Sequence, residues 1–475
     1  DNAIKESSYR IAAALRNNGY ALPGKKITIN MAPADLRKEG SAYDLTLAVG
    51  ILVASSQIST AVLDEYVIMG ELSLDGSLQP IKGALPIAIK AKEEGFKGFF
   101  LPKQNVKEAA IVAGLDVYGV ENVQEVIDFL EGKGTLEPTR IDTRAEFYKT
   151  LDFPEFDFSD VKGQESIKRC MEIAAAGGHN IILIGPPGAG KTMLAKRLPS
   201  ILPPMTLREA LETTKIHSVA GKLKEVGLMN QRPFRSPHHT ISNVALVGGG
   251  SYPQPGEISM AHNGVLFLDE LPEFKRDVLE VMRQPLEDRE VTISRAKFTV
   301  TYPSSFMLVA SMNPSPSGFF NDPSAPQTSS PHEMQRYLSK ISGPLLDRID
   351  IHIEVTPVPF EKLSDDRKAE SSVDIRQRVT AARELQSQRF AFLENIHYNA
   401  QMNTKHIREF CALDDASKEL LKTAMERLNL SARAYDRILK VSRTIADLEA
   451  SPNVMASHIA EAIQYRSLDR EGWLG

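Results

Sequence analysis

Residues 180–204 read NIILIGPPGAGKTMLAKRLPSILPP, and this stretch decides the fold. The apolar run IILIG predicts a strand buried on both faces, and the residues after Thr192 predict a helix. Between them lies G-x-x-x-x-G-K-T, formed by Gly185, Pro186, Pro187, Gly188, Ala189, Gly190, Lys191 and Thr192. Glycines in such a loop let backbone N–H groups surround phosphates at the positive end of the helix. The stretch therefore predicts an ATP site, with Lys191 on the phosphates and Thr192 on Mg²⁺.

Two further apolar runs end in polar residues that suit the same chemistry. GVLFLDEL ends a strand with Asp269, which can hold Mg²⁺, and Glu270, which can polarise the attacking water. MLVASMNP places Asn313 at a strand tip, where an amide can sense the γ-phosphate. An acidic strand end at the surface, and an asparagine in a turn before proline, are the alternatives. Gly163 and Gln164 precede the phosphate loop and are weak candidates for holding adenine.

The composition of the chain limits the classes of protein to which it can belong. The chain has 475 residues, 25% of them charged, with a net charge of −5, which argues against a protein that coats nucleic acid with its whole surface. Cys170 and Cys411 have no metal-type spacing and fit a reducing compartment. No apolar run reaches the ~18 residues of a membrane span, so we expect a cytoplasmic protein. The chain begins at Asp1, already in a helical period, so we expect a native segment to precede it.

The order of apolar patterns predicts an α/β protein in four parts. Residues 1–135 form an α/β unit, in which KKITINMAP is a strand and Asp75-Gly76 is the turn of a hairpin. Residues 136–160 are an irregular linker rich in acid and proline. Residues 161–360 alternate strands and helices, as in a parallel sheet with crossover helices. Residues 361–475 are almost entirely helical in pattern.

A phosphate loop, an Asp-Glu strand end, a polar strand tip and a helical lid, in this order, resemble the AAA+ ATPases. Longer motifs resemble the ComM/YifB family, the magnesium-chelatase-like proteins of bacteria. These motifs are RPFRSPHHTISNVALVGGG, PGEISMAHNGVLFLDELPEF, ISGPLLDRIDIHIEV and LSARAYDRILKVSRTIADL. The resemblance runs from residue 1 to the C-terminus and implies a homo-hexameric ring.

The resemblance also implies roles for two arginines. Arg348 in LLDRID would be an arginine finger, which acts on ATP bound to the neighbouring subunit. The alternative is that Arg348 forms only a local salt bridge with Asp347 or Asp350. Arg433 in SARAYDR would be the lid arginine that contacts the nucleotide, with a surface charge on a helix as its alternative.

Relatives carry an insert and a hairpin that can face the pore of the ring. Here the insert lies within residues 222–250, and the hairpin is REVTISRAKFTVTYP. The basic side chains of these two segments could bind DNA phosphates without recognising the base sequence, or they could be ordinary surface charges. These basic residues are Lys222, Lys224, Arg232, Arg235, Arg295 and Lys297. His238 and His239 are poor metal ligands if they lie on one strand, because adjacent side chains then point to opposite faces.

The chain departs from the family pattern in two regions. Family members often carry cysteines after the polar strand tip, where this chain has Ser315, Ser317, Gln327 and Ser329, so we predict no structural zinc. The N-terminal region resembles a Lon-protease-type domain, in which a lysine activates a serine. Ser41 is present, but Leu85 and Pro86 occupy the segment where that lysine would fall, so we expect a non-proteolytic domain.

The resemblance implies an ATP-driven hexameric DNA motor, a helicase that performs branch migration while incoming DNA is integrated in natural transformation. Its DNA would be single-stranded or branched. The alternative is a magnesium-chelatase-type ATPase that remodels a protein partner without DNA, because the two groups share their ATPase core.

Overall fold

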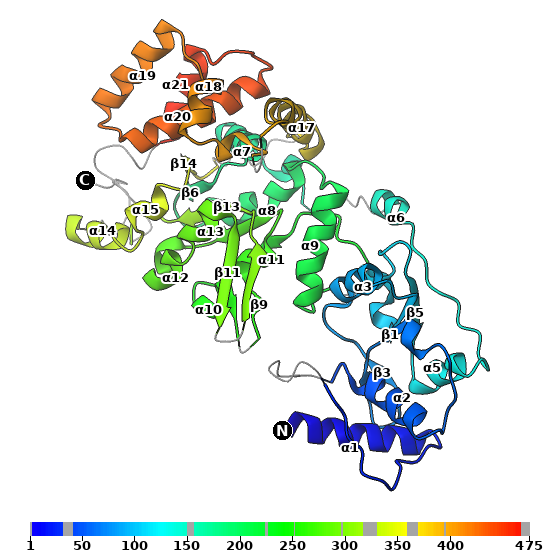
Figure 1. Ribbon diagram of the computed structural model, residues 1–475. Coiled ribbons are helices and arrows are strands. Elements are labelled where there is room, and N and C mark those ends of the chain that lie inside the picture. The colour runs from blue at the N-terminus through cyan, green and yellow to red at the C-terminus, as the bar shows by residue number, and fades with distance from the viewer. Residues whose placement is uncertain are drawn as a thin grey trace. The chain divides into compact units, whose positions relative to one another are not determined.

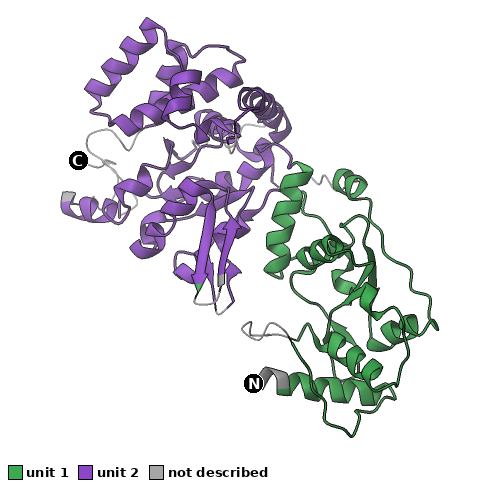
Figure 2. Ribbon diagram, viewed as in Figure 1, with its two compact units in different colours: residues 1–151, 206–230, 295–297 green, residues 152–205, 231–294, 298–475 purple. Residues whose placement is uncertain are grey.

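A computed structural model of the protein describes residues 2–31, 41–149, 156–223, 227–250, 252–295, 298–316, 330–358, 369–393 and 396–466. The chain forms two compact units, which Figure 2 distinguishes by colour. Unit 1 comprises residues 1–151, 206–230 and 295–297. Unit 2 comprises residues 152–205, 231–294 and 298–475. The boundaries expected at residues 135, 160 and 360 remain predictions.

Unit 2 is built on a five-stranded sheet (Figure 1). In spatial order, the strands are β14 (Ile351–Glu354), β6 (Ile181–Ile184), β13 (Met307–Met312), β10 (Val265–Leu268) and β7 (Phe234–Arg235). Every neighbouring pair is parallel, which confirms the predicted α/β class. Because the strands run the same way, their carboxyl ends share one edge, and β13 lies between the strand of the phosphate loop and the strand that ends at Asp269.

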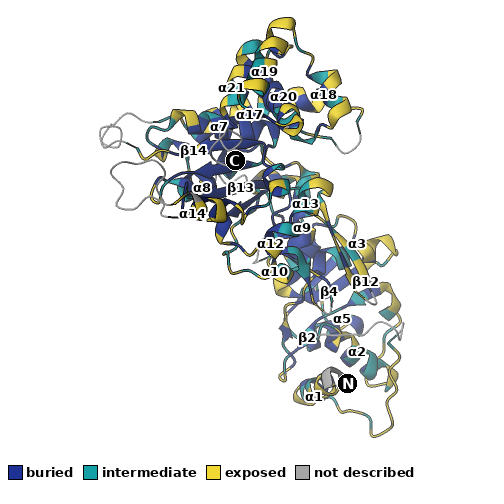
Figure 3. Cartoon of the chain, turned by 90° about the vertical axis from the view of Figure 1, so that its left-hand side faces the viewer, coloured by how far each residue is buried: buried dark blue, intermediate teal, exposed yellow. Residues whose placement is uncertain are grey.

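Alternate side chains of the central strands enter two hydrophobic cores. Ile181 and Leu183 of β6 pack on one face, and Ile182 and Ile184 pack on the other. The helices that contribute to the first core include α7 (Glu165–Gly177) and α8 (Lys191–Ile201), and those of the second include α10 (Asn243–Val247), α11 (Glu257–Met260), α12 (Arg276–Glu280), α14 (Pro331–Leu338) and α15 (Gly343–Leu346). Coverage on both faces explains why the strands are apolar throughout rather than alternating. Figure 3 shows the resulting buried layer.

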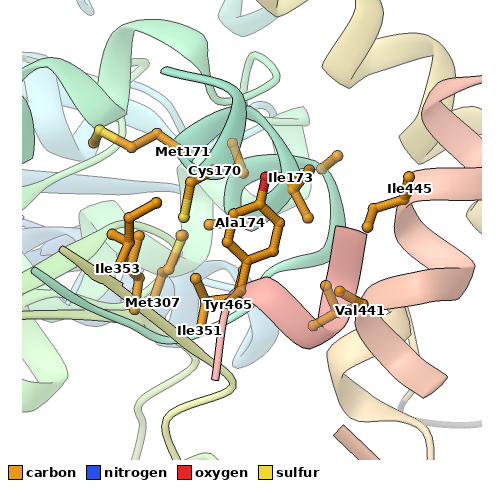
Figure 4. Packing of buried hydrophobic residues seen from close by; sticks show 14 of the residues in the cluster. Cys170, Met171, Ile173, Ala174, Met307, Ile351, Ile353, Val441, Ile445 and Tyr465 are labelled. Carbon is orange, nitrogen blue, oxygen red and sulfur yellow. The ribbon is translucent and has the colours of Figure 1, made fainter. Parts of the chain in front are cut away.

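The C-terminal part of unit 2 is helical, as predicted. Its α-helices are α17 (Ser372–Arg389), α18 (Thr404–Phe410), α19 (Asp415–Arg427), α20 (Ala432–Leu448) and α21 (Ala456–Gln464). Helix α20 packs against α7, α17 and α21, so its apolar face extends the first core. Figure 4 shows Tyr465, which follows α21, in this cluster with Ala174 of α7 and Val441 of α20. We call these five helices the lid.

Two short strands outside the main sheet form the predicted hairpin. They are β11 (Glu290–Arg295) and β12 (Phe298–Pro303), and they pair as a separate two-stranded sheet. The hydroxyl groups of Thr292 and Thr301 lie 3.0 Å apart across the pair. Before these strands in the sequence, unit 2 also contains the paired β8 (Gly248–Gly249) and β9 (Gln254–Pro255) and the helix α13 (Arg283–Asp288).

Unit 1 has a small parallel sheet of its own, ordered β1 (Tyr66–Ile68), β4 (Gly98–Pro102) and β5 (Asp116–Val120). Phe100 stacks on Tyr118 with ring centroids 4.8 Å apart. A hairpin of β2 (Glu71–Leu72) and β3 (Leu78–Gln79) encloses Asp75-Gly76, where Gly76 has a φ of 90° that suits glycine. The helices of this unit are α1 (Asn2–Asn17), α2 (Asp44–Ala54), α3 (Ala84–Glu93), α4 (Val106–Ala109), α5 (Val123–Leu130), α6 (Thr143–Lys149) and α9 (Leu207–Val219).

Two local predictions for unit 1 and its surroundings are wrong. The expected strand KKITINMAP forms none over its described residues, 25–31. The expected linker contains α6, so it is not irregular throughout. Helix α9 packs on α3 within unit 1, where the Gly83 N–H donates to the Ser218 carbonyl at 3.0 Å. Local propensity could not reveal that long-range contact.

Candidate nucleotide site

The phosphate loop follows β6 and leads directly into α8. Gly188 and Gly190 have φ values of 80° and 88°, which side chains other than glycine rarely adopt. A Cβ on Gly185 would lie 2.2 Å from the carbonyl oxygen of Val355, so only glycine fits against the end of β14. These glycines shape a loop whose backbone can approach phosphates, with the N-terminus of α8 beneath it.

Lys191 and Asn313 meet at the carboxyl edge of the sheet. The Lys191 Nζ donates to Asn313 Oδ1 at 3.1 Å and to the carbonyls of Gly185 and Pro186 at 2.6 and 3.0 Å. Burial lowers the pKa of Lys191, although the charges of Asp269 and Glu270 partly offset this effect. The ammonium group is therefore held beside a carboxylate pair in a partly desolvated place, where its attraction for phosphate is strong.

Thr192 and Asp269, the two residues predicted to hold Mg²⁺, are in contact with each other. The Thr192 Oγ1 donates to Asp269 Oδ2 at 2.8 Å. The other carboxylate oxygen, Oδ1, accepts a hydrogen bond from the hydroxyl of Ser311, a fully buried residue of β13. Ser311 is not among the site residues predicted from the sequence. Its signal was a hydroxyl inside the apolar strand MLVASM, two residues before Asn313.

Glu270 has a backbone conformation that is unusual for its residue type. Its φ of 53° lies in the left-handed region, which costs an L-residue about 1 kcal/mol. The backbone N–H of Glu270 donates to Asp269 Oδ1 at 3.1 Å and to the Ser311 hydroxyl at 3.2 Å, and both bonds hold this turn. The Glu270 side chain is 57% exposed and faces His239, whose Nδ1 lies 3.9 Å from Glu270 Oε2. The turn thus aims the carboxylate outward, where a water could approach.

His238 and His239 lie in a loop after β7 rather than on a strand. Their ring centroids are 4.0 Å apart, so the argument that they point to opposite faces is wrong. Within the described ranges, no group of three His, Cys, Asp or Glu side chains is arranged to hold a metal ion.

Gln164 connects the loop before α7 to the phosphate loop. Gly163 and Gln164 both have positive φ, 65° and 58°. The Gln164 Nε2 donates to the carbonyls of Ala189 and Thr356 at 3.2 and 3.0 Å. Its Oε1 is buried and has no hydrogen-bond partner among the described residues. An unpaired buried acceptor next to the phosphate loop fits a donor such as the amino group of adenine.

Arg348 and Arg433 lie at the opposite edge of the sheet. Arg348 pairs with Glu287, not with Asp347 or Asp350, and donates to the Pro344 carbonyl at 2.6 Å, whereas Arg433 pairs with Asp347. Both arginines line a cavity of about 500 Å³. Its wall also includes Asn180, Gly264 and Met307, which stand at the amino ends of β6, β10 and β13. The phosphate loop and Asp269 stand at the carboxyl ends.

Comparison with known proteins finds relatives over nearly the whole chain. Family models described as "Subunit ChlI of Mg-chelatase", "Magnesium chelatase, subunit ChlI" and "Magnesium chelatase, subunit ChlI C-terminal" match residues 1–105, 157–363 and 369–466. "Uncharacterized protein YifB" of Escherichia coli is 45% identical over 474 residues, covering 99% of this chain and 90% of that protein. "Competence protein ComM" of Haemophilus influenzae is 43% identical over 471 residues, covering 99% and 91%.

The chain belongs to the ComM/YifB family of magnesium-chelatase-like AAA+ proteins. A Lon-type resemblance is confirmed as well, since "Lon protease 2" of Bacillus subtilis is 29% identical over 150 residues, covering 30% of this chain and 27% of that protein. In unit 1 the Ser41 hydroxyl donates to Glu71, and Leu85 is fully buried in α3. In this ComM/YifB protein, the segment where the Lon-type lysine is expected therefore contributes an apolar side chain to the core of α3.

The basic residues of the ComM/YifB insert divide into two groups. Arg232 donates to the carbonyls of Pro203 and Asn263 at 2.7 and 2.8 Å, and Arg235 makes two bonds to the Glu257 carboxylate at 2.6 and 2.7 Å. Both guanidinium groups therefore hold unit 2 together, and a DNA phosphate would have to compete with these bonds. Lys222 of the insert and Arg295 of the hairpin, by contrast, are exposed.

Several predicted residues lie outside the described ranges. Of the basic candidates, these are Lys224 and Lys297. Of the four residues at the family's cysteine positions, Ser317, Gln327 and Ser329 lie outside, whereas Ser315 is described and buried.

Proposed function

We propose that this protein hydrolyses ATP as an AAA+ motor. The observation that carries the proposal is the meeting of Lys191, Asn313, Thr192 and Asp269 at one sheet edge. Lys191 holds the β- and γ-phosphates, Glu270 polarises the attacking water, and Asn313 senses the γ-phosphate. Mg²⁺ fits the oxygen pair of Thr192 and Asp269 and, when bound, neutralises phosphate charge.

The active assembly in this proposal is a homo-hexameric ring. Arg348 and Arg433 stand at the amino ends of strands whose carboxyl ends carry the phosphate loop, so they serve ATP only if it is bound to another subunit. A head-to-tail contact between identical subunits closes into a ring. In that ring, Arg348 adds positive charge at the transition state, and Arg433 contacts the same phosphates.

The substrate in this proposal is single-stranded or branched DNA in the cytoplasm, moved during integration of incoming DNA in natural transformation. The name of the Haemophilus influenzae relative, "Competence protein ComM", supports this choice. Lys222, Arg295 and the neighbouring Lys224 and Lys297 are the proposed phosphate contacts. No described helix combines the length and apolar character needed to cross a membrane.

A second candidate is supported by the family descriptions, all three of which name a magnesium chelatase subunit. In that case the ring would remodel a protein partner, and DNA would not change its activity.

The two candidates predict different responses to forked DNA. ATP hydrolysis is measured with and without it, together with movement of a labelled four-way junction, over a range of salt. The motor proposal predicts stimulated hydrolysis and a steep loss of DNA affinity as salt rises. Hydrolysis that ignores DNA, with no junction movement, supports the second candidate. Glu270→Gln is the control, because it binds ATP without turnover.

A further inference from the structure

Tyr337 of α14 connects that helix to Asn313 at the tip of β13. The Tyr337 hydroxyl donates to the backbone carbonyl of Asn313 at 3.2 Å. The residue is 8% exposed and packs in the second hydrophobic core. Burial raises the pKa of Tyr337, and the charge of Glu273 raises it further, so the phenol keeps its proton and remains a donor.

Asn313 is the first residue beyond the sheet, so its backbone depends on another support. The carbonyl of Met312, the last residue of β13, still accepts from the Gly185 N–H at 3.1 Å. The carbonyl of Asn313 is bonded to Tyr337 instead of to the neighbouring strand. Because the direction of a side chain depends on the backbone that carries it, this bond helps to aim the Asn313 amide, whose Oδ1 accepts from Lys191.

Helix α14 also contacts the turn that carries Glu270. The Lys340 Nζ donates to Glu273 Oε1 at 3.2 Å, and the Glu273 N–H donates to the Glu270 carbonyl at 2.8 Å. Lys340 and Glu273 have side chains that are 43% and 48% exposed, and ion pairs at such positions contribute little. The buried hydroxyl of Tyr337 is therefore the stronger of these two links between α14 and the nucleotide site.

A cavity of about 480 Å³ lies beside Asn313, and its lining includes Glu270, Tyr337 and Lys340. Because this side of Asn313 faces open space, packing does not fix its backbone there. If the Tyr337 hydroxyl were removed, a water in the cavity could bond the Asn313 carbonyl in its place. The carbonyl would then keep a partner but lose a fixed one, so the orientation of Asn313 would suffer more than the stability of the fold.

We infer that Tyr337 is a positioning residue for ATP hydrolysis, which holds Asn313 in the orientation that the γ-phosphate requires. This role rests on the proposed function, because Asn313 senses the γ-phosphate only if ATP is hydrolysed at this site. Tyr337 acts through Asn313 rather than on the phosphates, since its hydroxyl is bonded to the Asn313 backbone. In the alternative interpretation, the hydroxyl only satisfies a carbonyl group and serves stability.

The test is Tyr337→Phe, which keeps the packed ring and removes only the hydroxyl. ATP hydrolysis by the full chain is measured without DNA, in the wild-type and in the Asn313→Ala background. In the wild-type background, kcat should fall about fivefold, the effect of about one hydrogen bond, while KM stays within about twofold. In the Asn313→Ala background, the same change should leave the residual rate as it is, because the residue through which Tyr337 acts is absent.

Tyr302→Phe is the matched control. The Tyr302 hydroxyl also donates to a backbone carbonyl, that of Pro253, at 2.8 Å, and its side chain packs against the same core. This change should lower thermal stability about as much as Tyr337→Phe does, without lowering kcat. An unchanged kcat in Tyr337→Phe, an equal loss in both backgrounds, or an equal loss in Tyr302→Phe would overturn the inference. If the wild-type chain itself hydrolyses no ATP, the proposed function fails as well, so the wild-type rate distinguishes the two failures.

Discussion

Lys191 and Asn313 are 122 residues apart in sequence, yet the Nζ of one donates to the Oδ1 of the other at 3.1 Å. This contact exists because β13 lies beside β6 in the sheet, with Ser311 opposite Leu183 and Met312 opposite Ile184. The phosphate loop and the polar strand tip are thus placed by strand order, which fixes their distance more rigidly than any loop could.

The two residues should have separable roles. Lys191→Ala is expected to abolish detectable ATP binding, because it removes the only ammonium group bonded to the described phosphate loop. Asn313→Ala should bind ATP within about threefold of the wild-type affinity but hydrolyse it at least about tenfold more slowly, since the amide acts on the γ-phosphate. Fluorescent-nucleotide titration and a phosphate-release assay measure the two quantities. Equal loss of binding in both variants would contradict this division.

Ser311→Ala tests a residue that acts through Asp269. The change removes one bond to the carboxylate and one to the Glu270 N–H, so kcat should fall about tenfold while the protein stays folded. Ser311→Thr should restore part of the rate, because it keeps the hydroxyl. If Ser311→Ala lowers thermal stability without changing kcat, the residue serves packing only.

Two substitutions of Glu270 should separate the effect of its backbone strain on stability from the effect of its carboxylate on ATP hydrolysis. Glu270→Gln keeps the side-chain volume and the positive φ, so its stability should match the wild type while turnover stops. Glu270→Gly should also stop turnover, but it should raise the free energy of unfolding by up to about 1 kcal/mol by relieving the left-handed strain. Urea unfolding of the three proteins checks this order. If the glycine variant were clearly less stable than the glutamine variant, the positive φ of Glu270 would not be a source of strain.

The ionisation of Asp350 should make the free energy of unfolding of unit 2 depend on pH in the acidic range. Burial opposes its ionisation, but the hydrogen bond and charge of His179, with the charges of Lys440 and Arg437, outweigh burial and lower the pKa to about 2. A depressed pKa stabilises the fold above the ordinary value of 3.8, and this stabilisation is lost as pH falls from 3.8 toward 2.

Asp350→Asn should therefore cost about 2 kcal/mol of unfolding free energy at neutral pH and should flatten the pH dependence below pH ~4. Urea unfolding at neutral pH and at pH ~3 measures both effects. An asparagine variant as stable as the wild type at neutral pH would show that the His179 contact contributes nothing.

Arg235→Ala should affect the stability of the protein, whereas Arg295→Ala should affect its binding to DNA. Arg235 makes two bonds to Glu257, so its loss should destabilise the protein by about 1–3 kcal/mol. Arg295 is exposed, so its loss should leave stability within about 0.5 kcal/mol but reduce DNA affinity and the salt slope. Thermal unfolding and fluorescence anisotropy on single-stranded DNA provide the readouts. The reverse pattern would contradict the assignment of Arg235 to the scaffold.

The residues at the carboxyl edge of the sheet could be predicted from the sequence better than the side chains that surround them. Lys191, Asp269 and Asn313 each follow a continuous apolar run, and the parallel order brings such strand ends together. Ser311 was missed because one hydroxyl in an apolar strand has no periodic signal. The partners of Arg348, Arg433 and Arg235 could not be predicted, because each ion pair joins segments whose proximity depends on tertiary packing. The packing of helix α9 on α3 could not be predicted for the same reason.

In the proposed ring, the carboxyl edge of one subunit and the arginines at the amino edge of the next form one ATP site. ATP hydrolysis by an equimolar mixture of Lys191→Ala and Arg348→Ala proteins shows whether the two edges act together. Each variant alone should be inactive. If interfaces act independently, about a quarter of those in mixed rings combine an intact Lys191 with an intact Arg348, so the mixture should regain about a quarter of the wild-type rate. A mixture that stays as inactive as its components, although mixed rings form, would contradict the account.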